Sequence, residues 1–333
     1  MGPDNRSLLA IKNLSVSFFS DQGEVRAVRD VSLTINAGQT LALVGESGCG
    51  KSTVALAIMR LIDAPGRIVG GQILFRGRDL AALPESELRA IRGKEIGMIF
   101  QEPMTSLNPV FPIGAQISEV LSTHLGLSDR AARAEALRLL EKVGIPSAAH
   151  RIDQYPHELS GGMKQRVMIA IALACQPDLL IADEPTTALD VTIQAQILEL
   201  LQALQEEMRM AILLITHNLG VVAQFAKDVQ VMYAGKIVEQ ADVITLFKNP
   251  LHPYTRALLK ALPRPGHRAE RLASIPGTVP SPLQYPKGCA FAPRCPDERA
   301  GYRENQPPLH EVEPGHAVAC WLYEQELGIR GSI

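Results

Sequence analysis

The chain has no excess of charge of either sign and no long hydrophobic run. Its 333 residues carry 33 Lys and Arg against 35 Asp and Glu, which gives a formal net charge of −2. Proteins that bind nucleic acid electrostatically usually show a strong basic excess, so this balance argues against a nucleic-acid partner. The longest apolar stretches, residues 167–175 and 179–182, are much shorter than the roughly 20 residues that a transmembrane helix needs.

Cysteines are few, and the N-terminus does not look like a leader peptide. Five cysteines in a chain of this length do not make a disulfide framework. The first ten residues, MGPDNRSLLA, lack the basic start and apolar core of a secretory signal. We therefore expect the chain to stay in the cytoplasm. Its hydrophobic fraction of 46% is ordinary for a globular protein.

Hydrophobic periodicity predicts an α/β fold. Period-two alternation near the N-terminus predicts antiparallel strands. The alternating residues are Leu9, Ile11, Leu14, Val16 and Phe18, then Val31, Leu33 and Ile35. Apolar runs that predict buried strands occur at residues 40–44, 178–183 and 211–216, and helical patterns at 51–61, 165–174 and 191–208. Strands that alternate with helices indicate a parallel sheet covered by helices.

The composition divides the chain into two parts. Charged helical patterns at residues 85–91 and 129–143 predict a mostly helical insertion in the middle of the chain. After residue 247 periodicity fades and prolines become frequent. These are Pro250, Pro253, Pro263, Pro265, Pro276, Pro280, Pro282 and Pro286. We expect a main domain at residues 1–250, with a helical subdomain at about 100–175, and a small loop-rich C-terminal extension at 251–333.

A glycine-rich loop provides the first functional motif. Residues 45–52, Gly-Glu-Ser-Gly-Cys-Gly-Lys-Ser, fit the P-loop pattern G-x-x-x-x-G-K-[ST] between a predicted strand and a predicted helix. The glycines let backbone N–H groups surround phosphates, and the helix adds its positive N-terminal end. Lys51 can reach the β- and γ-phosphates, and the Ser52 hydroxyl can bind Mg²⁺. The residues expected around the nucleotide are Gly45, Ser47, Gly48, Cys49, Gly50, Lys51, Ser52 and Thr53.

Two adjacent carboxylates follow the second buried strand. Asp183 would hold Mg²⁺ through water, and Glu184 could polarise the attacking water as general base. An Asp-Glu pair after an apolar strand is a weak signal by itself. It becomes a strong one in a chain that also carries a P-loop.

A Ser-Gly-Gly run opens the predicted helix at 165–174. Bare N–H groups at Ser160, Gly161 and Gly162, together with the helix dipole, would attract an anion. The simpler alternative is N-capping of the helix by Ser160. Because the chain already has a P-loop, we expect this second site to act on a nucleotide held by another subunit.

These motifs and their order resemble the nucleotide-binding subunits of ATP-binding cassette (ABC) transporters over nearly the whole chain. Residues 45–52 resemble the Walker A motif, 159–163 the signature motif, 179–184 Walker B, and 187–190 the D-loop that ends at Asp190. The resemblance implies that Gln101 senses the γ-phosphate and joins Ser52 and Asp183 at Mg²⁺. It also implies that His217 touches the γ-phosphate beside Glu184, and that Phe18 stacks on adenine.

The resemblance also implies a fold and a mechanism. The fold is the P-loop ABC type, with a parallel-sheet core, an antiparallel β subdomain and a helical subdomain. Two subunits close head to tail, and each ATP lies between one P-loop and the partner's signature residues. Closure pulls on the membrane subunits, and hydrolysis at Glu184 resets the dimer.

Finer motifs resemble the dipeptide and oligopeptide importers, and most closely the dipeptide permease ATPases. These motifs lie at residues 101–109, 183–192 and 249–255, together with Met163. The implied partners are a second, non-identical ATPase, two integral membrane permeases and an extracytoplasmic solute-binding protein, at the cytoplasmic face of the bacterial inner membrane. Nickel, glutathione and microcin-type importers share the motifs, and a homodimer stays open because both half-sites look intact. A non-transport ABC ATPase and an inactive nucleotide-binding module are the remaining alternatives.

Three cysteines lie in the extension. Related importer ATPases have four here, which resemble the ligand set of a [4Fe–4S] cluster. In this chain Tyr302 stands where the remaining cysteine is expected, beside Cys289, Cys295 and Cys320. Three alternatives stay open: a cluster with a substitute ligand such as His310 or His316, a zinc ion, or no metal.

Overall fold

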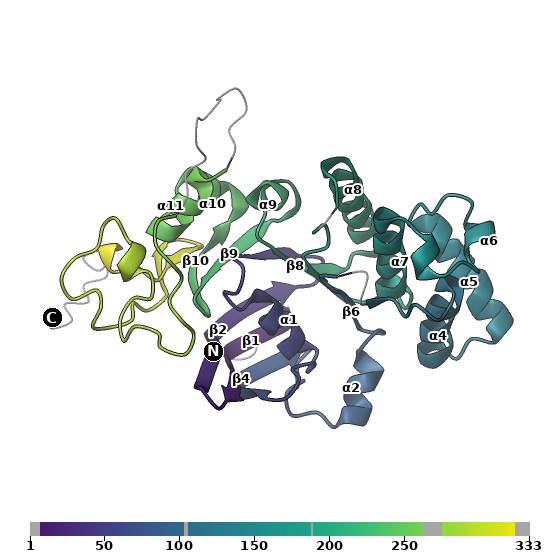
Figure 1. The fold of residues 1–333 in the computed structure, drawn as a ribbon, viewed down its shortest axis with the longest axis horizontal. Helices are drawn as coiled ribbons and strands as arrows, with labels where there is room; N and C mark the ends of the chain where they lie inside the picture. Colours follow the sequence, from purple (N-terminus) through teal and green to yellow (C-terminus); the bar gives the residue numbers. More distant parts are fainter. Residues whose placement is uncertain (1–6, 103–105, 188, 263–274, 324–333) are drawn as a thin grey trace.

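The structure, a computed structural model, describes residues 7–102, 106–187, 189–262 and 275–323. These residues form an antiparallel sheet and a larger, mainly parallel sheet, with helices packed around both (Figure 1). The helices of residues 113–173 and the C-terminal extension lie at opposite ends of the long axis. No helix in the described ranges is both long and apolar enough to cross a membrane.

The antiparallel sheet has the strand order β2-β1-β4-β5. Its strands are β1 (Ser7–Ser20), β2 (Gly23–Asn36), β4 (Gly66–Phe75) and β5 (Arg78–Asp79). The apolar residues that alternate along β1 and β2 are buried in one core with the helices α1 (Lys51–Ile58) and α2 (Glu85–Ile91). This sheet therefore forms one wall of the region behind the P-loop.

The main sheet has the order β11-β12-β10-β9-β3-β8-β7-β6. Its first three strands are β11 (His310–Glu313), β12 (His316–Val318) and β10 (Lys236–Asp242). Its parallel centre consists of β3 (Thr40–Val44), β6 (Ile96–Ile99), β7 (Leu179–Asp183), β8 (Ala211–Thr216) and β9 (Asp228–Tyr233). Strands β3, β7 and β8 are buried nearly throughout, as expected of strands with both faces covered. Their carboxyl ends carry the P-loop, Asp183 and His217, so parallel pairing brings the three motifs to one edge of the sheet.

A group of helices packs on one side of the main sheet. It contains α4 (Ile113–Leu125), α5 (Asp129–Lys142), α6 (Ala148–Arg151), the short 3₁₀ turn η1 (Pro156–Glu158) and α7 (Gly161–Leu173). Together with α8 (Val191–Met208) it shares a core that is separate from that of the antiparallel sheet. The expectation that residues 85–91 belong to this group is wrong. Helix α2 buries Leu88 and Ile91 in the antiparallel-sheet core, because strand β6 returns the chain to the main sheet before α4 begins.

The C-terminal residues add to the edge of the main sheet. Strand β10 (Lys236–Asp242) pairs with β12 (His316–Val318), which pairs with β11 (His310–Glu313). The helices α9 (Leu219–Phe225), α10 (Val243–Lys248) and α11 (Pro253–Lys260) and the 3₁₀ turn η2 (Ala292–Arg294) complete the described elements. The extension is thus joined to the ATPase sheet through strand pairing.

Candidate functional site

The P-loop leaves strand β3 in a conformation that requires glycine at two points. Gly45 has φ 156° and Gly50 has φ 107°. A Cβ atom at Gly45 would lie 2.2 Å from the Met232 carbonyl oxygen, and one at Gly50 would lie 2.4 Å from that of Ala27. The loop is therefore wedged between β2 and β9.

Lys51 is buried under the loop that it serves. The side chain is 4% exposed, and its Nζ donates to the carbonyl oxygens of Gly45 at 2.9 Å and Glu46 at 3.1 Å. Gly50 caps helix α1 without a side-chain hydrogen bond, so the first N–H groups of the helix have no side-chain acceptor at this cap. A buried cation beside a helix N-terminus is an arrangement that binds phosphate.

Ser52 and Asp183 meet across the sheet. The Ser52 hydroxyl donates to Asp183 Oδ1 at 3.1 Å. Burial and the neighbouring Glu184 raise the pKa of Asp183 to about 6, against the lowering effect of Ser52 and Lys51. A buried carboxylate next to a hydroxyl is an incomplete set of hard oxygen ligands. Mg²⁺ fits this set, since it binds through one or two protein oxygens, water and phosphate.

Glu184 is the centre of a polar cluster. Its Oε2 accepts from Thr187 Oγ1 at 2.8 Å and from Gln101 Nε2 at 3.3 Å, and its Oε1 lies 3.1 Å from His217 Nδ1. Burial works to raise the pKa of Glu184, but the hydrogen bonds from Thr187 and His217 outweigh it and keep the pKa below its usual value. Its φ of 46° is unusual for a residue with a side chain. The structure thus brings the three expected catalytic residues together and adds Thr187, which sequence reasoning missed.

The signature residues lie apart from the P-loop of their own chain. Ser160 and Gly161 are exposed at the start of α7, which belongs to the helical group, whereas α1 lies beside the antiparallel sheet (Figure 1). Ser160 Oγ accepts from Met163 N at 3.4 Å, so the capping alternative is realised. Capping uses the serine oxygen and leaves the helix N-terminus facing outward.

The two remaining expected site residues, Phe18 and Asp190, each make contacts within their own element or its neighbours. Phe18 is half-buried, packs against the antiparallel-sheet core, and lies against Gly66. The next residue, Phe19, is exposed and stacks under Arg67, with 4.3 Å between Cζ and the ring centroid. Asp190 caps helix α8 by accepting from Ile193 N at 3.0 Å. Within the expected Q-loop and D-loop patterns, residues 103–105 and 188 lie outside the described residues.

The cysteines of the extension are partly or fully buried, which disfavours their thiolate form. Burial raises the pKa of Cys289, Cys295 and Cys320, the last to about 12. His316, one suggested substitute ligand, instead contacts Glu239 through Nε2 at 2.8 Å. Over the described ranges no group of three His, Cys, Asp or Glu side chains is placed to hold a metal ion.

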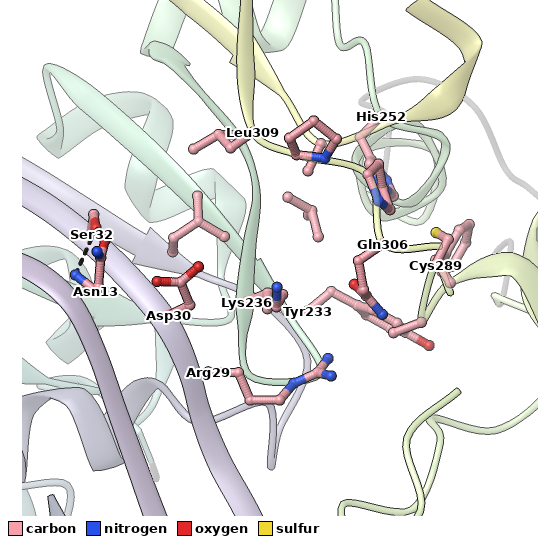
Figure 2. A pocket seen from close by; sticks show the side chains of 17 residues that line it. Asn13, Arg29, Asp30, Ser32, Tyr233, Lys236, His252, Cys289, Gln306 and Leu309 are labelled. Carbon is pink, nitrogen blue, oxygen red and sulfur yellow. Dashed lines mark hydrogen bonds between the residues drawn. The ribbon is translucent and has the colours of Figure 1, made fainter. Parts of the chain in front are cut away.

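A separate cavity of about 360 Å³ lies between strand β2 and the extension (Figure 2). Arg29 and Lys236 line it from the ATPase side, and Cys289 and Gln306 from the extension. Burial and the nearby Arg29 lower the pKa of Lys236. The P-loop does not line this cavity, so it is distinct from the phosphate site.

The fold and the polar cluster define an ATP-hydrolysing P-loop protein of the ATP-binding cassette class, and similarity to known proteins agrees with this. Residues 28–187 match the family model described as "ABC transporter", and residues 238–301 match "Oligopeptide/dipeptide transporter, C-terminal region". The chain belongs to the ATP-binding subunits of ABC transporters that carry this C-terminal region. The expected fold class and ATPase activity, which requires ATP and Mg²⁺, are confirmed.

Two relatives illustrate the similarity. A "Putative peptide import ATP-binding protein" of Brucella melitensis biotype 1 is 53% identical over 330 residues, covering 96% of this chain and 98% of the relative. A "Probable peptide ABC transporter ATP-binding protein" of Sinorhizobium fredii is 51% identical over 316 residues, covering 94% of each.

Solved cassettes share the fold over most of the chain. The dimeric cassette MJ0796 bound to ADP and Pi has a TM-score of 0.64 and 28% identity, covering 71% of this chain and 98% of its own. The cbiO1 cassette of Clostridium perfringens has a TM-score of 0.62 and 27% identity, covering 73% and 92%. More than a quarter of this chain therefore has no counterpart in these cassettes.

Proposed function

We propose that this chain is the ATPase subunit of an ABC importer that takes up dipeptides or oligopeptides. The observation that carries the proposal is a complete phosphate and water-activating cluster in a chain that also matches the oligopeptide/dipeptide C-terminal region. The names of the relatives in Brucella and Sinorhizobium support the peptide cargo. Residues 1–250 would be the ATPase domain and 251–333 the extension.

Each residue of the cluster has a role that its position suits. Lys51 would exchange its two carbonyl acceptors for phosphate oxygens, and the backbone from Gly45 to Thr53 would surround them. Ser52, Asp183 and Gln101 would hold Mg²⁺, which when bound draws charge from the phosphate oxygens. The hydrogen bonds that keep the pKa of Glu184 below its usual value favour the carboxylate form, which would take the proton of the attacking water. His217, which lies 3.1 Å from that carboxylate, would hold it in place and touch the γ-phosphate.

We further propose that two cassettes share each nucleotide. The helix N-terminus at Ser160, Gly161 and Gly162, of which the first two residues are exposed, would bind the ATP held on the P-loop of the partner, near Asp190. The dimer of the MJ0796 cassette supports this arrangement. Phe18 would stack on the adenine of its own site. A non-identical second ATPase is the proposed partner, and a homodimer is the alternative.

The membrane partners would dock beside the Q-loop. Phe100, Val110 and Phe111 are exposed apolar residues on the segment that connects β6 to α4. Exposed apolar side chains gathered in one segment are typical of a protein interface. Two permeases and a solute-binding protein would complete the importer, with this chain at the cytoplasmic face of the bacterial inner membrane. Nucleic acid has no part in this proposal.

Transport can be tested in a strain that lacks the chain. Uptake of labelled dipeptides and of a tetrapeptide is measured after complementation with wild type or with Glu184→Gln. We expect wild type alone to restore peptide uptake, while nickel and glutathione uptake stay unchanged in every strain. Peptide uptake unaffected by the deletion would reject the peptide cargo, and loss of nickel or glutathione uptake would assign that cargo instead.

An iron–sulfur cluster on Cys289, Cys295 and Cys320 is kept as a hypothesis with its own test. The chain is purified anaerobically, and iron content and visible absorbance are measured. Iron at the level of four atoms per chain would support it, whereas iron-free, colourless protein would leave three protonated thiols, as the raised thiol pKa values suggest.

A further inference from the structure

Every polar group of Glu46, the second residue of the P-loop, is held by another residue. Its carbonyl oxygen accepts from Lys51 Nζ at 3.1 Å and from Cys49 N at 3.3 Å, both within the loop. Its N–H donates to the Tyr254 hydroxyl at 2.8 Å. Its carboxylate accepts from Arg294 Nη1 at 2.8 Å and Nη2 at 3.2 Å. The last two partners belong to the region after residue 250.

Arg294 is fixed from several sides. Its side chain is 3% exposed. Its Nε donates to the Pro276 carbonyl oxygen at 2.9 Å, and Nη2 also lies 3.3 Å from the carbonyl oxygen of Ile275. The Glu46 carboxylate and the Tyr233 hydroxyl raise the pKa of Arg294 further, against the effect of burial. A guanidinium with this many fixed acceptors has little freedom to follow a moving loop, so it holds Glu46 in one place.

Tyr254 is fixed by aromatic packing. Its ring centroid lies 4.6 Å from that of Tyr233 and 5.5 Å from that of Phe291, and Tyr233 meets Phe291 edge-on at 5.3 Å. Figure 2 shows Tyr233 beside the cavity, near His252 and Cys289. The cluster joins strand β9, helix α11 and the loop before η2, so both contacts to Glu46 depend on the extension being docked.

The charge of Glu46 gives these contacts an electrostatic consequence. A P-loop binds a polyanion, and a carboxylate within the loop repels it unless a cation neutralises the carboxylate. Arg294 is the cation that forms this ion pair. We propose that Arg294 and Tyr254 are positioning residues of the ATP site: they hold and neutralise Glu46, so that ATP affinity depends on the docked C-terminal extension.

Arg294 and Tyr254 would act on the affinity for ATP, whereas Glu184 would act in the hydrolysis step. The role of Arg294 and Tyr254 rests on the proposed binding of ATP at this P-loop. Cassettes of similar fold that are covered to 92–98% of their own length match only 71–73% of this chain, so this chain carries residues that those cassettes lack. Both positioning residues lie within residues 238–301, which match the oligopeptide/dipeptide C-terminal region. We therefore expect loss of the contacts to raise the KM for ATP and to leave kcat nearly unchanged.

The test uses the purified full chain and measures both ATP binding and hydrolysis. Labelled Mg-ATP is titrated at equilibrium, and steady-state rates give kcat and KM. The variants are Arg294→Gln, Arg294→Lys, Tyr254→Phe, Glu46→Gln and the double variant Glu46→Gln/Arg294→Gln. Arg303→Gln is the matched control, because it removes an exposed ion pair with Glu298 elsewhere in the extension. Melting curves identify any variant that fails to fold.

We expect Arg294→Gln to weaken ATP binding about tenfold and Tyr254→Phe about threefold, with kcat within about twofold of wild type. The double variant should bind ATP more tightly than Arg294→Gln, since the unneutralised carboxylate is gone. A role in folding alone would not produce this recovery. If Arg294→Gln does not fold, Arg294→Lys takes its place. Lysine keeps the positive charge but loses the two-pronged guanidinium, so its loss of ATP affinity should be measurable but less than about tenfold.

Unchanged ATP affinity in Arg294→Gln and Tyr254→Phe, or a double variant no better than Arg294→Gln, would overturn the proposal. A wild-type chain that binds ATP without hydrolysing it would instead contradict the proposed ATPase function, and the binding titrations would still decide the role of Arg294. Arg303→Gln should match wild type in both measurements.

Discussion

Glu239 is a fully buried carboxylate that ties the extension to strand β10, and its removal should undock the extension. Its Oε1 accepts from Leu251 N at 2.6 Å and lies 2.8 Å from His316 Nε2, while its Oε2 accepts from His252 N at 2.9 Å. Its exposure is 0%. These contacts join β10 to β12 and to the start of α11, the helix that carries Tyr254.

The cost follows from the hydrogen bonds that are lost. In Glu239→Ala three buried donors lose their acceptor, at about 1–3 kcal/mol each before relaxation, so we expect a net loss of about 3–5 kcal/mol. In Glu239→Gln one oxygen can still accept, but the amide N–H₂ faces the His252 N–H, so the loss should be about 1–3 kcal/mol. Glu298→Ala, at an exposed ion pair, should cost less than about 1 kcal/mol.

The sole tryptophan makes the effect measurable. Trp321 lies in the extension, where its Nε1 donates to the Asn305 carbonyl oxygen at 3.0 Å. Its fluorescence during urea titration should therefore report the extension, while circular dichroism reports the whole chain. In Glu239→Ala we expect the fluorescence midpoint to lie at a lower urea concentration than in wild type, and also below the midpoint from circular dichroism. A midpoint shifted no more than in Glu298→Ala would refute the assigned role of Glu239.

Three further outcomes can be checked. Glu184→Gln should lower ATP hydrolysis by about 10²–10⁴-fold while ATP still binds and holds a closed dimer, and undiminished hydrolysis would exclude Glu184 as the base. Burial and nearby Arg256 lower the pKa of His252 to about 3 from 6.5, so stability should decline as the pH falls below 6.5, by about 2 kcal/mol at pH 5. Thermal unfolding of His252→Asn should show a flatter pH dependence than wild type, and an equal slope would contradict this. Burial raises the pKa of Cys49, so alkylation should be slow and slower still with Mg-ATP, whereas equal rates with and without nucleotide would argue against shielding.

Parts of the fold could be predicted because their signals are local. Strands β3 and β8 and helix α8 have the bounds that the sequence predicted, since each is an apolar or amphipathic run between clear turn residues. Strand β4 was not predicted, because Gly66, Gly70 and Gly71 interrupt its alternation of apolar and polar residues. The pairing of β10 with β12 joins residues almost eighty positions apart, and no local pattern encodes it.

In the candidate site, too, some features could be predicted from the sequence and others could not. The motif residues were found because phosphate chemistry demands particular residue types at fixed spacing, as at Lys51 and Ser52. The positive φ of Glu184 and its contact with Thr187 arise from the turn after β7, which residue types alone do not specify. The contacts of Glu46 with Arg294 span 248 positions. The signal that could have indicated them was a carboxylate inside a phosphate-binding loop, which requires a cation nearby.

We propose that ATP hydrolysis by this chain drives peptide uptake, and coupled activity in the assembled transporter tests this most directly. The transporter is purified from membranes with its permeases, reconstituted in liposomes, and assayed for ATP hydrolysis with and without binding protein and peptide. We expect hydrolysis that rises when both are present and that is lost in the Glu184→Gln transporter. A hydrolysis rate that does not change when peptide and binding protein are added, or that stays at the wild-type level in Glu184→Gln, would contradict peptide-coupled hydrolysis by this chain.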